Sequence, residues 1–193
     1  MEPLRELSES RPPVYFRPML DSVVVEELAP DDLDGAIPGL SLVLAACVEK
    51  GASIGFLPPF DAAEAAEFWR KMAVQIRAGE RRLLAARRGA DIVGAVMVVL
   101  AMPANGRHRA EISKLIVDPD GRRLGIGRAL MKAAEALARR EGRKLLVLDT
   151  RTGDVAEKLY AGLGFRKTGE IPDYVVSETG ALESTTVMYK QLA

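Results

Sequence analysis

The chain has 193 residues, of which 48% are hydrophobic and 28% are charged, values typical of a globular domain and unlike those of disordered or collagen-like chains. Its 27 lysine and arginine residues balance 27 aspartate and glutamate residues, so no net positive field attracts nucleic acid or anionic lipid. Cys47 is the single cysteine, which excludes an internal disulfide and a zinc site made of several thiolates of one chain.

The first 21 residues differ from the rest of the chain. They carry charges throughout and four prolines, without the unbroken apolar stretch of a signal peptide. No later segment approaches about 20 consecutive apolar residues, the length of a membrane-spanning helix. We therefore expect a tail or arm over residues 1–21 and a single domain over residues 22–193. We also expect a cytoplasmic protein that binds no membrane, nucleic acid or metal.

The first half of this domain begins with a strand and helical segments. Pro38 and Gly39 interrupt the helical spacing of residues 32–50, which predicts two helical pieces joined by a kink. The apolar loop 51–60 is unusual for a surface connection, and we expect it to line a pocket. In chain order, the predicted elements are a strand over 22–28, the helical segment 32–50, a helix over 61–78, and antiparallel strands over 82–87, 92–101 and 109–117.

The second half alternates helices with strands. Gly142 and Gly164 stand where a glycine commonly ends a helix. The order predicts a mixed α/β sandwich, with α+β-like layers, of about seven strands and about four helices. Its predicted elements are a helix over 125–142, a buried strand over 144–148, a helix over 155–163, and strands over 165–170 and 185–190.

A segment rich in arginine and glycine, residues 122–127, joins the predicted strand 109–117 to the next helix, and Arg128 follows it. The first N–H groups of a helix have no internal acceptor, and the helix dipole adds about half a positive charge there. Gly125 and Gly127 leave these amides open to phosphate oxygens. The segment lacks the lysine of a Walker A loop and the third glycine of a dinucleotide fingerprint. It predicts a pyrophosphate site without nucleotide hydrolysis, with a simple tight turn as the alternative.

A second motif, residues 156–165, carries Leu159 and Tyr160 at the end of a helix and a glycine stop before a strand. Together the two motifs resemble the GNAT family of acetyltransferases over roughly residues 80–190. The resemblance implies a mostly antiparallel twisted sheet, acetyl-CoA as cosubstrate, and Tyr160 near its sulfur. It also implies an oxyanion held by main-chain N–H groups where two strands splay apart. The residues implied to bind the cosubstrate are Leu115, Ile116, Val117, Arg122, Arg123, Leu124, Gly125, Ile126, Gly127, Arg128 and Ala129.

A narrower resemblance concerns the tabtoxin-resistance branch of the family, and it rests on segments 51–56, 105–111, 148–150 and 169–174. In that branch the proposed base and acid correspond by motif to Asp149 and Tyr160. Glu111 is a rival base, because many members of the family carry a glutamate on this strand. His108 and Tyr174 are candidates for contact with the acceptor. A helix cap or turn for Asp149, packing alone for Tyr160 and a surface position for His108 stay open as structural alternatives.

The predicted function is transfer of an acetyl group from acetyl-CoA to the primary amine of a small molecule by direct attack. The narrower resemblance suggests an amino-acid-like metabolite or toxin as acceptor. The alternatives are a non-catalytic acyl-CoA sensor and a protein or peptide N-acetyltransferase. One departure is Gly153 and Asp154, where many members carry an asparagine that bonds the pantetheine arm. Members of the family occur as monomers and as dimers, and we favour a homodimer.

Overall fold

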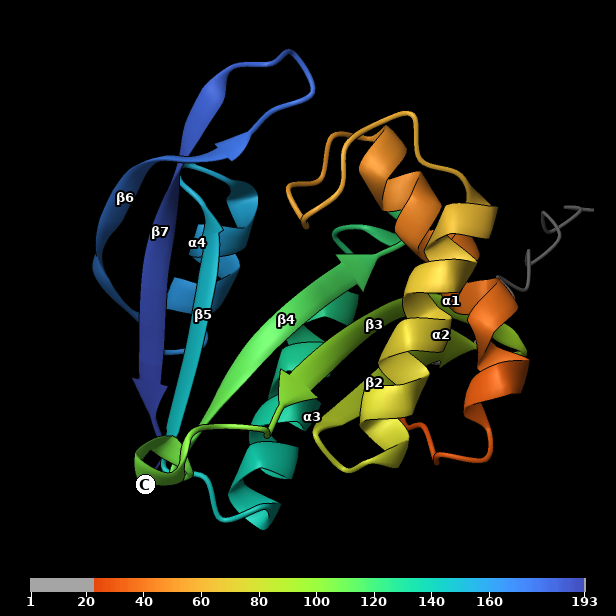
Figure 1. Cartoon of the computed structure of the whole chain (residues 1–193), viewed down its shortest axis with the longest axis horizontal. Helices are drawn as coiled ribbons and strands as arrows, with labels where there is room; N and C mark the ends of the chain where they lie inside the picture. The colour runs from red at the N-terminus through yellow and green to blue at the C-terminus, as the bar shows by residue number, and fades with distance from the viewer. Residues whose placement is uncertain (1–22, 193) are drawn as a thin grey trace, which may run out of the picture.

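The chain forms one seven-stranded sheet flanked by four helices in a computed structural model, which describes residues 23–192 (Figure 1). The tail predicted over 1–21 lies outside these residues. The strands are β1 Val24–Glu27, β2 Arg81–Arg88, β3 Asp91–Val99, β4 Arg109–Val117, β5 Leu145–Arg151, β6 Arg166–Val176 and β7 Leu182–Gln191. The helices are α1 Leu33–Glu49, α2 Ala62–Arg77, α3 Ile126–Arg140 and α4 Val155–Ala161, with short 3-10 turns at Ala104–Gly106 and Pro119–Gly121.

The sheet has the strand order β1-β2-β3-β4-β5-β7-β6 and is antiparallel except between β4 and β5. These two parallel strands pair only from Arg109 to Glu111 and from Leu145 to Val147. Beyond that point they separate, as Figure 1 shows for the green and cyan arrows. The mixed α/β fold expected from the order of elements is confirmed, and the separation of these two strands is the one that the family resemblance implies.

Two apolar cores cover the two faces of the sheet. Because successive side chains of a strand point to opposite faces, β2 alternates between them. Leu83 and Ala85 pack under α1 and α2, whereas Leu84 and Ala86 pack under α3. Tyr160 brings α4 into the same core as α3. The sheet is therefore a central layer packed on both faces, and its loops at one end can carry a site.

The helix α1 is continuous from Leu33 to Glu49, so the prediction of two pieces was wrong. Pro38 lies on the exposed face, where solvent can hydrogen-bond the carbonyl group that a proline leaves unpaired. A Cβ atom at Gly39 would stand 3.3 Å from the Cβ atom of Ile92. The glycine therefore allows the helix to approach β3 closely, and it does not mark a kink.

The C-terminal strands are longer than predicted. β6 runs from Arg166 to Val176 with almost every residue exposed, so it lacks the apolar alternation by which a strand is recognised. Its pairing with β7 shifts register at Gly169 and again before Val175, where Asp173 has a φ of 52°. Main-chain pairing with β7 extends this strand beyond the predicted residues 165–170. Within residues 23–192, no helix has the length and the apolar character needed to cross a membrane.

Candidate active site

The predicted pyrophosphate site is the loop that leads into α3 together with the first two residues of that helix, and we call these residues, 122–127, the cradle. Gly125 is the N-cap of α3 and has a φ of 82°, a left-handed conformation that glycine adopts without strain. A Cβ atom there would meet nothing within 4 Å, so the cradle faces open space. The first hydrogen bond of the helix runs from Ala129 N to Gly125 O, which leaves the preceding amides without helical acceptors. This geometry fits an anionic ligand.

Gly127 and the two arginines of the cradle have different surroundings. A Cβ atom at Gly127 would stand 3.3 Å from Cδ2 of Leu159, so this glycine allows α3 to pack against α4. The sequence did not predict this role. The Arg122 guanidinium lies close to the buried thiol of Cys47, where it opposes the rise in the pKa of that thiol that burial causes. Arg122 and Arg123 are exposed and supply positive charge at the rim of the cradle.

Next to the cradle, the last residues of β4 form the edge that β5 leaves unpaired. The register of β4 against β3 shifts here, since Ser113 pairs with Met97 and Ile116 with Ala95. Lys114, inside this bulge, has a φ of 52°. Bulges re-aim the backbone groups of a strand. Predicted cosubstrate residues 115–117 therefore lie on a distorted strand edge beside the cradle.

Tyr160 lies on α4 and is only 6% exposed. Its ring packs against Phe165, with centroids 5.9 Å apart. Burial raises the pKa of the Tyr160 phenol, and the negative charges of Asp154 and Asp149 raise it further. At neutral pH the phenol is thus protonated and can act as a hydrogen-bond donor.

The two candidate bases, Asp149 on β5 and Glu111 on β4, are both exposed. Asp149 Oδ2 lies 2.9 Å from Thr185 Oγ1, which also lies 2.9 Å from the carbonyl oxygen of Thr150. The cap of α4 is Asp154, whose side chain accepts a hydrogen bond from Ala156 N at 3.1 Å. Asp149 therefore does not cap this helix, and its carboxylate is held by a residue of the neighbouring strand β7.

Comparison with known proteins gives the family of the chain. Residues 49–165 match the acetyltransferase (GNAT) family. The chain belongs to the GNAT family. N-acetyltransferase 8B of Rattus norvegicus is 36% identical over 87 residues, which cover 44% of this chain and 39% of that protein. N-acetyltransferase 8 of Homo sapiens is 34% identical over 88 residues, with 45% and 39% covered. The match thus spans about two fifths of these curated relatives.

Solved GNAT structures share the fold over most of the chain. The structure of yncA from Salmonella typhimurium with its cofactor acetyl-CoA has a TM-score of 0.72 at 20% identity, covering 89% of this chain and 94% of that chain. A ribosomal-protein-alanine N-acetyltransferase from Brucella melitensis has a TM-score of 0.68 at 21% identity, covering 88% and 99%. At this identity the likeness shows the fold alone.

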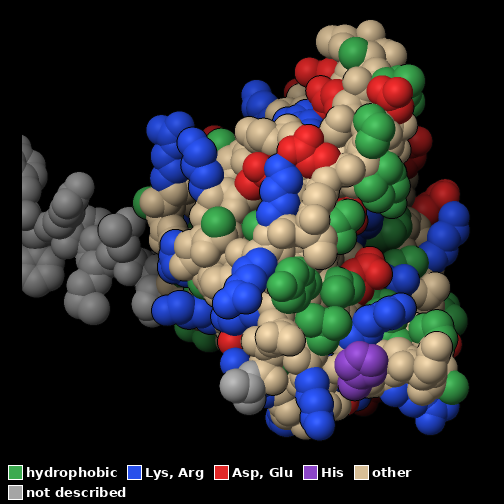
Figure 2. Space-filling model, turned by 90° about the vertical axis from the view of Figure 1, so that its left-hand side faces the viewer, with side chains coloured by type: hydrophobic (Ala, Val, Ile, Leu, Met, Phe, Trp, Pro, Cys, Tyr) green, Lys and Arg blue, Asp and Glu red, His purple; other side chains and the backbone are tan. Residues whose placement is uncertain are grey.

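A cavity of about 380 Å³ lies at the end of this GNAT sheet where β5 ends at Arg151, and we call it the loop pocket. Its walls come from the α1–α2 loop and the ends of the β6–β7 hairpin. Figure 2 shows acidic side chains gathered toward the top of the molecule, where this hairpin ends. The lining residues are Val48, Gly51, Ala52, Ser53, Gly55, Phe56, Leu57, Pro58, Arg151, Val175, Val176, Ser177, Glu178 and Glu183.

The charged side chains of the loop pocket are Arg151, Glu178 and Glu183. The Arg151 guanidinium lies 3.0 Å from Asp154 Oδ2 and 3.5 Å from Glu183 Oε2. The guanidinium of Arg151 and the carboxylate of Glu183 are close enough for an ion pair but do not form a hydrogen bond. The buried Oε2 atom of Glu183 therefore has no hydrogen-bond partner within residues 23–192. The α1–α2 loop was expected to line a pocket, and it does. The sequence did not predict that Arg151, Glu178 and Glu183 line the same pocket, because they come from segments that are far apart in the chain.

The structure does not bring His108 or Tyr174 into the loop pocket. His108 precedes β4 and is exposed, and it is the purple side chain low on the face shown in Figure 2. Tyr174 is 53% exposed on β6, although its neighbours Val175 and Val176 line the pocket. Contact of these two residues with an acceptor stays a prediction.

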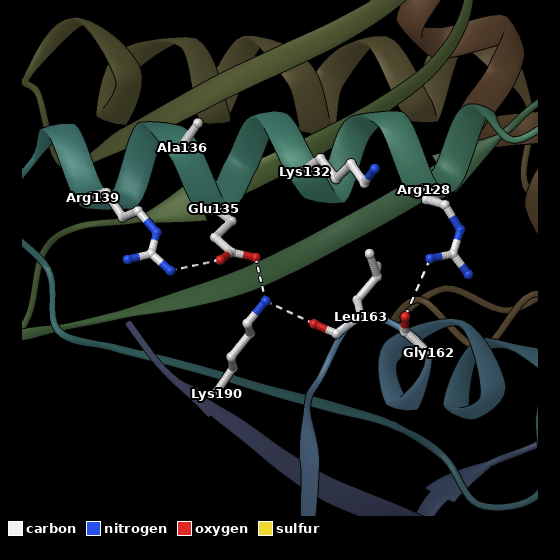
Figure 3. Close-up of a pocket in the computed structure, with 8 residues that line it drawn as sticks. All are labelled: Arg128, Lys132, Glu135, Ala136, Arg139, Gly162, Leu163 and Lys190. Carbon is white, nitrogen blue, oxygen red and sulfur yellow. Dashed lines mark hydrogen bonds and ion pairs between the residues drawn. The ribbon is translucent and has the colours of Figure 1, made fainter. Parts of the chain in front are cut away.

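A groove of about 470 Å³, lined mainly by charged side chains, lies between α3, the residues that follow α4, and β7 (Figure 3). Arg128 Nη1 donates to the carbonyl oxygen of Gly162 at 3.2 Å, so this arginine ties α3 to the end of α4. Lys190 Nζ contacts Glu135 Oε2 at 2.5 Å and the carbonyl oxygen of Leu163 at 2.7 Å. Partial burial opposes ionisation of Glu135, but Lys190 and Arg139 lower the pKa of its carboxyl group. We call this pair of Glu135 and Lys190 the clasp, since it joins α3 to β7.

Proposed function

We propose that this protein transfers an acetyl group from acetyl-CoA to the primary amine of a small molecule. The observation that carries the proposal is the separation of β4 from β5 directly beside the open first turn of α3, with Tyr160 buried nearby. Membership of the GNAT family supports acetyl-CoA as the acyl donor. The amine nitrogen bonds to the thioester carbon, the carbon–sulfur bond breaks, and the sulfur leaves as a thiolate that takes a proton.

The residues of the cradle fit the pyrophosphate of this donor. Gly125 leaves the first amides of α3 exposed, and Arg122 and Arg123 are near enough to balance phosphate charge. The pantetheine arm extends from there along the unpaired edge of β4, residues 115–117. An N–H group of this edge stabilises the oxyanion that forms on the thioester carbonyl.

Asp149 is the proposed base and Tyr160 the proposed acid. Asp149 removes a proton from the attacking amine, directly or through a water molecule, and Tyr160 donates a proton to the departing sulfur. Asp149 is preferred to Glu111 because its negative charge raises the pKa of the Tyr160 phenol, which supports a site shared by these two groups. The Thr185 hydroxyl holds the Asp149 carboxylate in position.

The loop pocket is the proposed acceptor site. An amine is a cation before it loses its proton, and Glu178 and Glu183 provide negative charge to attract it. An amino-acid-like acceptor carries a carboxylate as well, which the Arg151 guanidinium complements. The size of the cavity, about 380 Å³, suits a small molecule. This agrees with the resemblance to the tabtoxin-resistance branch.

Thiol-release assays with acetyl-CoA and a panel of amino acids, polyamines and short peptides test this function. We expect thiol release that depends on the amine, fastest with an amino-acid-like acceptor. Tight binding of acetyl-CoA without thiol release for every amine would contradict transfer and would favour a sensor. Preference for peptides over all small amines would favour a protein or peptide N-acetyltransferase.

A further inference from the structure

Lys114 joins β4 to the α1–α2 loop. Its Nζ atom donates a hydrogen bond of 2.7 Å to the carbonyl oxygen of Ile54, sixty positions earlier in the chain. The same ammonium group lies 5.4 Å from the ring centroid of Phe56 and 5.8 Å from that of Phe68. It therefore contacts both the loop and α2, with a charge-assisted hydrogen bond and two cation–π contacts.

The loop is shaped around this ammonium group. Gly55 has a φ of 88°, and a Cβ atom there would stand 3.2 Å from Lys114 Nζ. Phe56 continues the contact into the core, since its ring centroid lies 4.5 Å from that of Phe60 and 5.1 Å from that of Phe68. The loop is thus packed on α2 at one side and bonded to β4 at the other.

Lys114 also lies between the two functional surfaces of the site. Its backbone forms the bulge of β4, next to the edge proposed for the thioester. Gly55 and Phe56, which its ammonium group contacts, line the loop pocket. Burial lowers the pKa of Lys114, with Arg81 acting in the same direction, while Asp149 and Glu111 oppose the decrease. The ammonium group is thus near both candidate bases.

We propose that Lys114 is a positioning residue that fixes the loop wall of the acceptor pocket to the bulged strand, so that the acceptor amine is aligned with the thioester. The proposal rests on the transfer function proposed above. Lys114 acts through the loop and not on the reacting atoms. Its loss loosens residues 51–60 and weakens acceptor binding, whereas the cradle for acetyl-CoA is unaffected.

Two substitutions of Lys114 and one control test this proposal. Lys114→Met removes the donor and the charge but keeps an apolar stem of similar length, and Lys114→Arg keeps a cationic donor. Lys71→Met is the control, because Lys71 is exposed on α2. Amide hydrogen exchange of residues 51–60, the KM for the acceptor, kcat, and the Kd for acetyl-CoA are measured for each variant.

For Lys114→Met we expect exchange of residues 51–60 to be about tenfold faster or more, because the charge-assisted hydrogen bond is lost. We also expect an acceptor KM about fivefold higher or more, with the Kd for acetyl-CoA within about twofold of wild type. Lys114→Arg should restore both quantities substantially, and Lys71→Met should change neither.

Unchanged exchange of residues 51–60 in folded Lys114→Met would overturn the proposal. A lower kcat with an unchanged KM for the acceptor would also overturn it, because Lys114 would then act in the chemical step and not in positioning the acceptor. The exchange measurement requires no turnover. If wild-type protein transfers acetyl to no amine, the transfer function fails, while hydrogen exchange still decides whether Lys114 holds the loop.

Discussion

Tyr160 combines a buried ring with a phenol whose pKa is raised by burial and by neighbouring carboxylates. The raised pKa keeps the phenol protonated at neutral pH, so a proton is available for the departing sulfur. Tyr160→Phe keeps the packing against Phe165 and removes only the donor. We expect kcat to fall about tenfold or more, with the Kd for acetyl-CoA unchanged in isothermal titration. A wild-type kcat in this variant would exclude Tyr160 as the acid.

Two matched amide variants test whether Asp149 or Glu111 is the catalytic base. Asp149→Asn preserves the size of the side chain and its contact with Thr185, but the amide cannot accept a proton. We expect it to reduce kcat by about 10²-fold, whereas Glu111→Gln stays within about threefold of wild type. Steady-state rates at saturating acceptor give the comparison. A larger loss in Glu111→Gln would reverse the assignment of the base.

Among the strands, the pairing of β3 with β4 depends on a glycine. A Cβ atom at Gly94 would stand 2.9 Å from the carbonyl oxygen of Ile116 and 3.1 Å from Cδ1 of Leu130. We expect Gly94→Ala to lower the free energy of unfolding by about 1–3 kcal/mol, measured by urea denaturation. Gly169→Ala is the control, since a Cβ atom there meets nothing within 4 Å. Equal stability of the two variants would contradict the close approach at Gly94.

The elements differ in how well their sequence predicts them. β4 has the predicted bounds, 109–117, because turn residues precede it and an acidic and glycine-rich turn follows. α2 starts at Ala62 next to Asp61, whose side chain caps it as part of a capping box. β6 was predicted too short, since its length comes from main-chain pairing with β7 and not from apolar residues.

The sequence predicted only those parts of the candidate site whose residues are neighbours in the chain. The cradle is one continuous segment, so its residues could be found from the glycine spacing and the following helix. The bulge at Lys114 depends on the register of β4 against β3, which involves residues about twenty positions apart and leaves no pattern in either strand. The loop pocket combines residues near 55 and near 178, and only the folded sheet brings these together.

At the scale of the molecule, the clasp of Glu135 and Lys190 joins the half that carries α3 to the half that carries β7. Because the pKa of Glu135 is lowered in the folded protein, its contribution to stability is present above the ordinary glutamate pKa of about 4.3 and is lost as pH falls below it. We expect Glu135→Gln to be less stable than wild type at pH 7 and the difference to shrink below about pH 4. Urea denaturation at both pH values measures this. A difference that does not depend on pH would contradict an ionic clasp.

The whole arrangement depends on acetyl-CoA binding at the cradle, which isothermal titration of two Gly125 variants tests most directly. Asparagine and aspartate both tolerate the left-handed backbone at this position, and they differ in charge but hardly in size. We expect Gly125→Asp to bind acetyl-CoA about tenfold more weakly or worse than Gly125→Asn, because a carboxylate there repels the pyrophosphate. The two variants should unfold at similar temperatures, since aspartate also suits a helix N-terminus. Equal affinity of the two variants for acetyl-CoA would contradict the cradle as its binding site.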